Sequence, residues 1–285
     1  MKYFIATILS ACSLFSIAQN DSFYLLKADR VFDGESMHKG WVVLVQRNKI
    51  IQAGEMRFKL PENTRVIDLK GMTLLPGLIE GHSHIFLHPY NEASWNDQVL
   101  KESRAERSAR AVKHAEATLM AGFTTMRDLG TEGAMYDDAG IKTAIEKGVI
   151  IGPRMIVATR AIVAKGSYGV KSENADVDFP KGAAEVANED EMKREVRTQI
   201  SKGADVVKVY ADYRWGLHGE SMPTFSVQEI KSAVDIAKSS GRYVAVHAST
   251  AEGMIRSIAA GVHTIEHGTY GTEDIFKAMK ERNIA

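Results

Sequence analysis

The apolar positions of the chain follow two different patterns, and the change comes at Pro76. Before it, short apolar or β-branched runs alternate with turn signals such as Asp33-Gly34 and Arg47-Asn48. Runs of this length and composition, separated by Gly, Asn and Pro, are typical of short β-strands. The pattern predicts four or five strands that form half of a small β-sandwich. The runs lie near 24–26, 41–45, 49–51 and 65–67.

After Pro76, strand-like apolar runs alternate with amphipathic segments of helical length. The predicted strands are 74–80, 123–127, 154–158, 205–210, 243–247 and 262–267. The predicted helices are 99–121, 138–147, 188–202, 226–240, 250–260 and 272–282. Ser226 followed by Glu229 is a capping box, which marks the start of the fourth helix. Six consecutive β-then-α units indicate a parallel sheet, and strands that are apolar on both faces are typical of one.

Two α/β folds are compatible with this order: an open doubly wound sheet and a (β/α)8 TIM barrel. No Gly-rich phosphate loop follows the first strand, which argues against a dinucleotide-binding fold. Six units do not close an eight-stranded barrel. Because the chain stops after a helix, where a seventh strand would begin, we expect either an open fold or a missing C-terminal part. The expected domains are a β-sandwich part over 19–75 and a TIM-barrel domain, incomplete at six βα units, over 76–285.

The first eighteen residues have the pattern of a secretory signal peptide. A lysine at position 2 precedes an apolar stretch, and Ser16-Ile17-Ala18 has small residues at the two positions that specify cleavage. We therefore expect a secreted or periplasmic protein, with residues 1–18 removed. The single cysteine, Cys12, lies in this segment, and Leu9-Ser10-Ala11-Cys12 resembles a lipoprotein box, so lipid anchoring is the alternative.

Composition excludes some classes of partner. The chain has 36 basic and 36 acidic side chains, so it lacks the basic excess expected of a nucleic-acid or anionic-membrane binder. No further stretch has the length and apolarity of a transmembrane helix. A small molecule is the expected partner, and a homo-oligomer is compatible with the sequence.

Two histidines follow the first strand of the second region. His82 and His84 are separated by one residue, so on a strand they point to the same face and can reach one metal ion. They lie at the carboxyl end of a buried strand, where α/β barrels keep their active sites. His-X-His also occurs by chance on surfaces, so the pair alone does not distinguish a metal site from two surface histidines without a function.

His247 and His267 each end a later apolar strand. Taken singly, each is more often a structural histidine than a ligand. Together with the first pair, they place histidine at the ends of three strands, which would lie close together at the carboxyl end of a barrel. Imidazole suits zinc, iron and nickel, with zinc as the default for histidine and oxygen ligands.

Lys208 lies inside an apolar strand, where a charged amine carries a desolvation penalty. One interpretation is a lysine paired with a buried acid or reaching to the rim. The other is that desolvation lowers its pKa, so that the neutral amine adds carbon dioxide and becomes a carbamate able to bridge two cations.

Other candidate residues carry less information. Tyr168 and Tyr210 are candidates for lining a substrate pocket, with a packing role as the equal alternative. Arg127 and Asp128 end the second strand and should border the site, unless they form a structural ion pair. The loop 159–187 is long and should contribute to specificity. The remaining histidines, His38, His88, His114, His218 and His263, are not expected to be ligands.

Four motifs in order resemble the amidohydrolase superfamily. They are the segments 75–84, 203–209, 246–248 and 265–268, which resemble its first-strand histidines, strand-four lysine, and strand-five and strand-six histidines. The region before Pro76 resembles the family's N-terminal sandwich half. The resemblance extends to imidazolonepropionase-like members, which include Xaa-Pro dipeptidases.

The resemblance implies a site with two divalent metal ions. His82 and His84 would hold one metal, His247 and His267 the other, and carbamylated Lys208 would bridge them. A metal-bridging hydroxide would hydrolyse an amide or peptide C–N bond, of a dipeptide or modified amino acid. The family's aspartate at the end of strand eight has no counterpart in this chain, which therefore resembles a C-terminally truncated member.

Two alternatives stay open. Without the strand-eight aspartate, the chain could be a non-catalytic pseudoenzyme or fragment. The same site could also hydrolyse a lactone or a phosphotriester, since a metal-activated water attacks either centre.

Overall fold

The computed structural model describes residues 22–170, 174 and 176–285. The predicted signal peptide and Cys12 lie outside the described residues. The chain divides into two compact units, Met1–Pro76 and Gly77–Ala285. No helix among the described residues is both long and apolar enough to cross a membrane.

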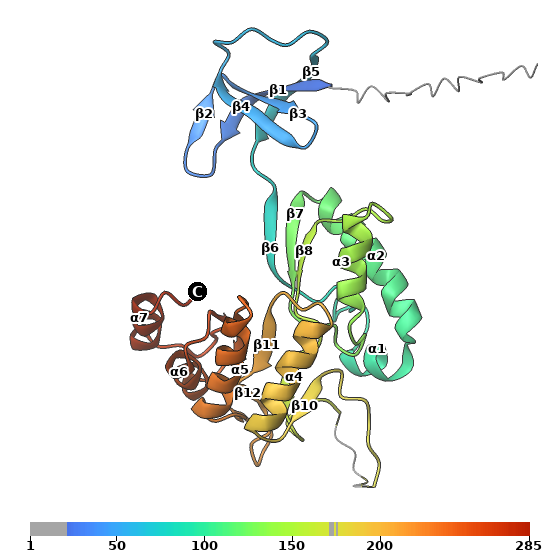
Figure 1. The fold of residues 1–285 in the computed structure, drawn as a ribbon, viewed down its shortest axis with the longest axis vertical. Coiled ribbons are helices and arrows are strands. Elements are labelled where there is room, and N and C mark those ends of the chain that lie inside the picture. Colours follow the sequence, from blue (N-terminus) through green and yellow to red (C-terminus); the bar gives the residue numbers. More distant parts are fainter. Residues whose placement is uncertain (1–21, 171–173, 175) are drawn as a thin grey trace, which may run out of the picture. The chain divides into compact units, whose positions relative to one another are not determined.

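The N-terminal unit contains one five-stranded sheet (Figure 1). Its strands are β1 (Phe23–Phe32), β2 (Met37–Lys39), β3 (Trp41–Gln46), β4 (Lys49–Glu55) and β5 (Arg65–Leu74). Strand β1 pairs antiparallel with β2 and β3 and parallel with β5. Leu25, Val42 and Leu44 form its small core. Other apolar side chains of the sheet, such as Ile50 and Val66, are exposed.

The second unit is an α/β structure with parallel strands, as the sequence predicts, but the strands form two sheets rather than one. The first sheet has the order β6-β7-β8 and the second β10-β9-β11-β14-β15. Their strands are β6 (Leu78–Ser83), β7 (Phe123–Asp128), β8 (Arg154–Val157), β9 (Ile162–Ala164), β10 (Ala184–Val186), β11 (Val207–Tyr210), β14 (Val244–Ala248) and β15 (Thr264–His267). A separate hairpin joins β12 (Asp212–Arg214) to β13 (Ser221–Pro223).

Backbone hydrogen bonds join the two parallel sheets between β8 and β11. The carbonyl of Val157 accepts from the amides of Asp205 (2.8 Å) and Val206 (3.3 Å), which lead into β11. At the far edge, Ala285 pairs with β15: its amide donates to His263, and its carbonyl accepts from Ile265. Within the described residues, these sheets do not close into a barrel.

Seven helices are present in the described part of the second unit, and they follow the strands in sequence (Figure 1). They are α1 (Trp95–Lys101), α2 (Arg104–Met120), α3 (Asp137–Glu146), α4 (Glu189–Ser201), α5 (Val227–Ser239), α6 (Ala251–Ala260) and α7 (Glu273–Glu281). The capping box at Ser226 and Glu229 is formed as predicted. The largest core lies between the second sheet and α4 to α7, and includes Val207, Val246 and Met254.

Three predicted boundaries were wrong. Leu74 ends β5, and the next strand begins only at Leu78, because Pro76 and Gly77 separate the two units. The predicted helix 99–121 is two helices, because Ser103 caps a new one and accepts from the amide of Glu106. The long loop 159–187 contains the short strands β9 and β10.

Candidate active site

The register of three parallel strands places polar side chains in rows across the second sheet. Tyr210 on β11 is opposite His247 on β14, which is opposite Glu266 on β15. Two residues earlier, Lys208 is opposite Ala245. Residues at i and i+2 of a strand share a face, so these side chains project from one face of the sheet, near the carboxyl ends of the strands.

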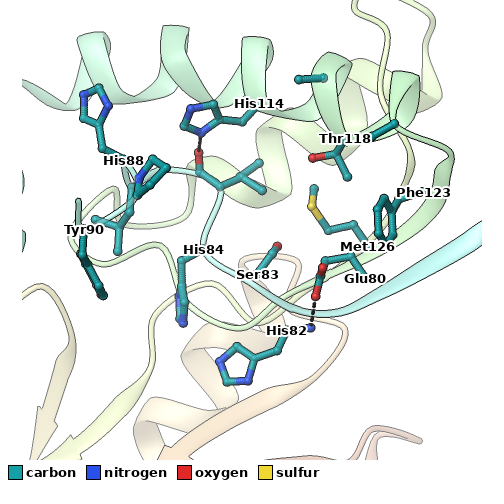
Figure 2. Close-up of a pocket in the computed structure, with 15 residues that line it drawn as sticks. Glu80, His82, Ser83, His84, His88, Tyr90, His114, Thr118, Phe123 and Met126 are labelled. Atoms are coloured by element: carbon teal, nitrogen blue, oxygen red, sulfur yellow. Dashed lines mark hydrogen bonds between the residues drawn. The ribbon is translucent and has the colours of Figure 1, made fainter. Parts of the chain in front are cut away.

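His82 and His84 project from β6 and the turn after it to the same side, away from His114 on α2 (Figure 2). His82 Nδ1 lies 3.0 Å from Glu266 Oε2, and His84 Nδ1 lies 2.8 Å from the carbonyl oxygen of Gly130. Each ring nitrogen that meets an oxygen in this way orients the ring and leaves Nε2 as the candidate ligand atom.

His247 and His267 approach each other although they are on different strands. Their ring centroids are 4.6 Å apart, and the His267 ring is 5.0 Å from that of His82. His267 has a left-handed backbone with φ of 74°. Because the preceding Glu266 already points inward, regular alternation would turn His267 away, and the left-handed residue allows both side chains to face the site.

The Lys208 side chain is completely buried, and its amine has no hydrogen-bond partner among the described residues. Burial lowers the pKa of Lys208 to about 8, against the opposing effect of the Glu266 carboxylate. The positive charge of Lys208 in turn contributes to lowering the pKa of His84, which burial lowers most. No acid among the described residues forms an ion pair with Lys208. The structure therefore does not contain the pairing with a buried acid that one interpretation of this lysine requires.

A buried carboxylate that the sequence analysis did not select holds this arrangement together. Glu266 accepts from Arg127 Nη2 (2.8 Å) and Thr264 Oγ1 (2.6 Å), besides its contact with His82. Burial alone would raise the pKa of Glu266, but the hydrogen bonds with His82 and Thr264 and the positive charges of Lys208 and Arg127 lower it to about 2. Arg127 thus pairs with Glu266 across the sheets.

Asp212 is a second unpredicted carboxylate, fully buried beside the other histidine pair. Its Oδ1 lies 3.4 Å from His247 Nε2. Asp212 also accepts hydrogen bonds from the amides of Ser249 and Thr250 at the start of α6. The contact fixes the Nε2 side of His247 and leaves Nδ1 for a ligand.

The predicted ligands fit divalent metal ions by their chemistry, but they do not form a complete metal-binding group. Among the described residues, no three His, Cys, Asp or Glu side chains are grouped so that they could hold a metal ion. The imidazoles form pairs, and the buried Lys208 amine lacks a partner. A lysine becomes an oxygen ligand only after it gains a carboxyl group, so the donor set is compatible with metals once Lys208 is modified.

Most of the chain matches one protein family. The model of the amidohydrolase family matches residues 73–285. The chain belongs to the amidohydrolase family. This match covers the whole second unit, including all five predicted metal-site residues.

Two named relatives of this amidohydrolase are each 29% identical to it over the aligned segments. An ochratoxinase of Aspergillus niger is 29% identical over 231 residues, which cover 74% of this chain and 46% of that protein. A dihydroorotase of Syntrophus aciditrophicus is 29% identical over 171 residues, covering 59% of this chain and 36% of that protein. The chain thus spans about half the length, or less, of these relatives.

Solved structures resemble the amidohydrolase closely in fold. A Xaa-Pro dipeptidase with bound methionine has a TM-score of 0.79 and 29% identity, and the aligned part covers 92% of this chain and 65% of the dipeptidase chain. A prolidase complexed with N-methylphosphonate-L-proline has a TM-score of 0.78 and 27% identity, and the aligned part covers 92% of this chain and 65% of the prolidase chain. These likenesses confirm the predicted resemblance to Xaa-Pro dipeptidases.

The two predicted pocket tyrosines lie together beside the histidines of the amidohydrolase. Tyr210 stacks on His247 with ring centroids 4.5 Å apart, and Tyr168 lies 5.1 Å from Tyr210. Both are buried. Tyr168 and His247 line the same cavity, whereas Tyr210 is not part of its lining and packs against Tyr168.

The other histidines have structural contacts. His114 Nδ1 lies 2.8 Å from the carbonyl of Ile85, and His88 contacts Glu92 and Glu102. Both histidines line a cavity of about 580 Å³ between β6 and α2, of which His82 and His84 form one side (Figure 2). His38 stacks on Trp41 in the N-terminal unit.

Proposed function

We propose that the chain carries most of the metal site of an amidohydrolase that cleaves a C–N bond in a dipeptide or modified amino acid. The observation that carries this proposal is the buried Lys208 amine, which lies on the same face as His247 and has no hydrogen-bond partner in the described part of the chain. An unpartnered buried amine costs stability, and a role as a modified metal ligand explains its presence.

The donor set supports two divalent cations, with zinc as the default. His82 and His84 would hold one cation, His247 and His267 the other, and Lys208, carboxylated at Nζ, would join them. Cations bound in this way polarise the scissile carbonyl and lower the pKa of a water molecule.

The residues of the chain itself orient and enclose this site. Glu266 and Gly130 fix the rings of His82 and His84, and Asp212 fixes His247. Arg127 balances the charge of Glu266, so the carboxylate stays ionised and keeps its hydrogen bond to His82. Ligands held by such partners are already in place when a metal arrives, which reduces the cost of ordering them.

We propose that the six strands β6, β7, β8, β11, β14 and β15 are part of a (β/α)8 barrel, and that the N-terminal sheet is half of a β-sandwich. The hydrogen bonds between β8 and β11 support one continuous row of strands. The pairing of Ala285 with β15 is the geometry of a further parallel strand.

A non-catalytic role is the second candidate. The described residues contain no complete metal-binding group, and the chain covers 65% of the dipeptidase that it resembles. Lactone and phosphotriester hydrolysis are variants of the first proposal, because the same activated water attacks those centres.

The test is hydrolysis by the 285-residue chain, loaded with zinc in the presence of bicarbonate. Substrates would be a dipeptide panel that includes Xaa-Pro peptides, N-acyl amino acids, a lactone and a phosphotriester. The proposal predicts amine release that chelation and His82→Ala abolish, whereas His38→Ala, in the N-terminal unit, leaves it unchanged. Absence of turnover with every substrate would favour the non-catalytic candidate.

A further inference from the structure

A second cavity, of about 420 Å³, lies beside His247 and is lined mainly by aromatic rings. Its lining includes Tyr90, Trp95, Tyr168, Tyr213, Tyr270 and Arg214. The hydroxyl side chains of Ser221, Ser249 and Thr269 complete the lining, and a volume of a few hundred Å³ is typical of small-molecule sites. Because His247 forms part of the lining, a ligand in this cavity would be next to the proposed metal site.

We propose that this cavity selects amide substrates that carry both an aromatic ring and a carboxylate, and that Glu132 positions its wall. The proposal rests on the proposed function and names its substrate class. The ring would pack against Trp95 and Tyr213 from within the cavity, and the carboxylate would pair with Arg214.

Glu132 holds two walls of the cavity with one oxygen atom. Its Oε2 accepts from Trp95 Nε1 (2.9 Å) and from Tyr168 Oη (2.6 Å). Glu132 is buried, and its own carbonyl accepts from Arg107 Nη2 (2.7 Å). A charged acceptor makes both hydrogen bonds strong, so the two rings are fixed before any ligand enters.

The aromatic rings form a continuous path from Trp95 to His247. Trp95 meets Tyr168 edge to face, with centroids 5.7 Å apart, and Tyr168 meets Tyr213 at 4.6 Å. Tyr213 in turn is 6.3 Å from His247. Aromatic pairs favour these edge-to-face and tilted geometries, and a substrate ring that packs against them from the cavity gains contacts of the same kind.

Arg214 supplies the charge that the aromatic wall lacks. It ends strand β12, its side chain is exposed, and it makes no ion pair with any other described residue. A guanidinium that lines a cavity is suited to a carboxylate, which it can bind through two parallel hydrogen bonds. The cavity thus combines fixed aromatic rings and hydroxyl groups with one cation that no described residue neutralises.

The test is calorimetric binding of N-acetyl-L-phenylalanine and N-acetyl-L-alanine to the 285-residue chain. We expect the phenylalanine derivative to bind about tenfold more tightly, as the contact energies of aromatic pairs imply. Arg214→Ala should weaken both ligands by a similar factor and keep their ratio. Arg194→Ala, at an exposed position on α4, is the control and should change neither.

Glu132 variants test positioning separately from charge. Glu132→Leu should bring the ratio of the two dissociation constants close to one, whereas Glu132→Gln, whose amide oxygen can still accept from both rings, should largely retain it. If Glu132→Leu fails to fold, Trp95→Leu at a half-buried position should lower the ratio in the same way. Equal binding of the two ligands, no binding of either, or an unchanged ratio in the leucine variants would overturn the inference.

With a chelator present during calorimetry no amide is hydrolysed, so binding is measured without turnover and the two proposals fail separately. Ring-selective binding by a chain that hydrolyses no amide would refute the proposed function alone. Amide hydrolysis with no preference for aromatic substrates would refute the selectivity and leave the proposed function standing.

Discussion

His82 Nδ1 lies 3.0 Å from Glu266 Oε2, although 184 residues separate them in the chain. The contact joins β6, in the first parallel sheet, to β15, at the far end of the second. Arg127 Nη2 donates to the other oxygen of the same carboxylate, at 2.8 Å. Through this pair the orientation of a candidate ligand on the first strand depends on the position of the last strand.

Replacing Glu266 by glutamine should weaken zinc binding about 10–100-fold, as losses of partners that orient metal ligands do. The amide would keep the shape but not the charge that polarises the His82 ring. Competition with a chromogenic zinc chelator would measure the affinity. Glu252→Gln, which removes a surface ion pair on α6, is the control. Equal affinities for the two variants would show that Glu266 does not support the site.

Lys208→Met should stabilise the metal-free chain and remove its zinc binding. The methionine side chain fills a similar volume without a buried amine, so we expect the free energy of unfolding to rise by about 1–3 kcal/mol. Urea unfolding would measure the change. Lys142→Met is the matched comparison, because Lys142 has a partner, Asp205, at 2.7 Å, and its loss should destabilise the chain. A destabilised Lys208→Met variant would mean that the amine has a stabilising role in the unmodified protein.

Gly253→Ala should destabilise the chain and disturb Asp212. A Cβ at position 253 would come 2.4 Å from Asp212 Oδ2, so the carboxylate that faces His247 would have to move. We expect a loss of about 1–3 kcal/mol, typical of overpacking. Gly140→Ala on α3 is the control: nothing lies within 4 Å of its Cβ, so it should stabilise by about 0.5–1 kcal/mol. A thermally neutral Gly253→Ala would contradict the close packing at Asp212.

Asp138 should make the chain less stable as the pH rises from 5 to 8. Burial, assisted by the charge of Asp205, raises the pKa of Asp138 to about 7 from an ordinary value of 3.8. Between these values the folded chain keeps a proton that the unfolded chain loses, so the free energy of unfolding falls as pH rises through this window.

The variant Asp138→Asn should remove up to about 2 kcal/mol of this pH dependence. Urea unfolding at pH 5 and pH 8 would measure it, with Asp235→Asn, at an exposed helical ion pair, as the control. A pH dependence that is the same in both variants would show that Asp138 is not the group responsible.

The strands of the second unit could be predicted because buried parallel strands are continuous apolar runs. Every predicted strand after Pro76 overlaps an observed one. The predictions that were wrong depend on local signals, which the periodicity of apolar residues does not reveal. Ser103, with Glu106 three residues later, starts a new helix inside an unbroken amphipathic pattern. The short strands β9 and β10 contain three residues each, too few to show a period.

The orienting residues could not be predicted in the same way, because their partners are distant in sequence. Glu266 and Asp212 become relevant only when the strands are placed side by side. One signal was available for Glu266: like Lys208, it is a charged residue within an apolar strand. Glu132 gave no such signal, since it lies in a loop, and its contacts with Trp95 and Tyr168 are each more than thirty residues away.

The metal content of the 285-residue chain tests the central claim most directly. After dialysis against zinc and bicarbonate, elemental analysis should find about two zinc ions per chain, and His82→Ala combined with His84→Ala should lower the content to about one. A chain that retains no zinc, or a double variant that retains as much as the original, would contradict a metal site built from these residues.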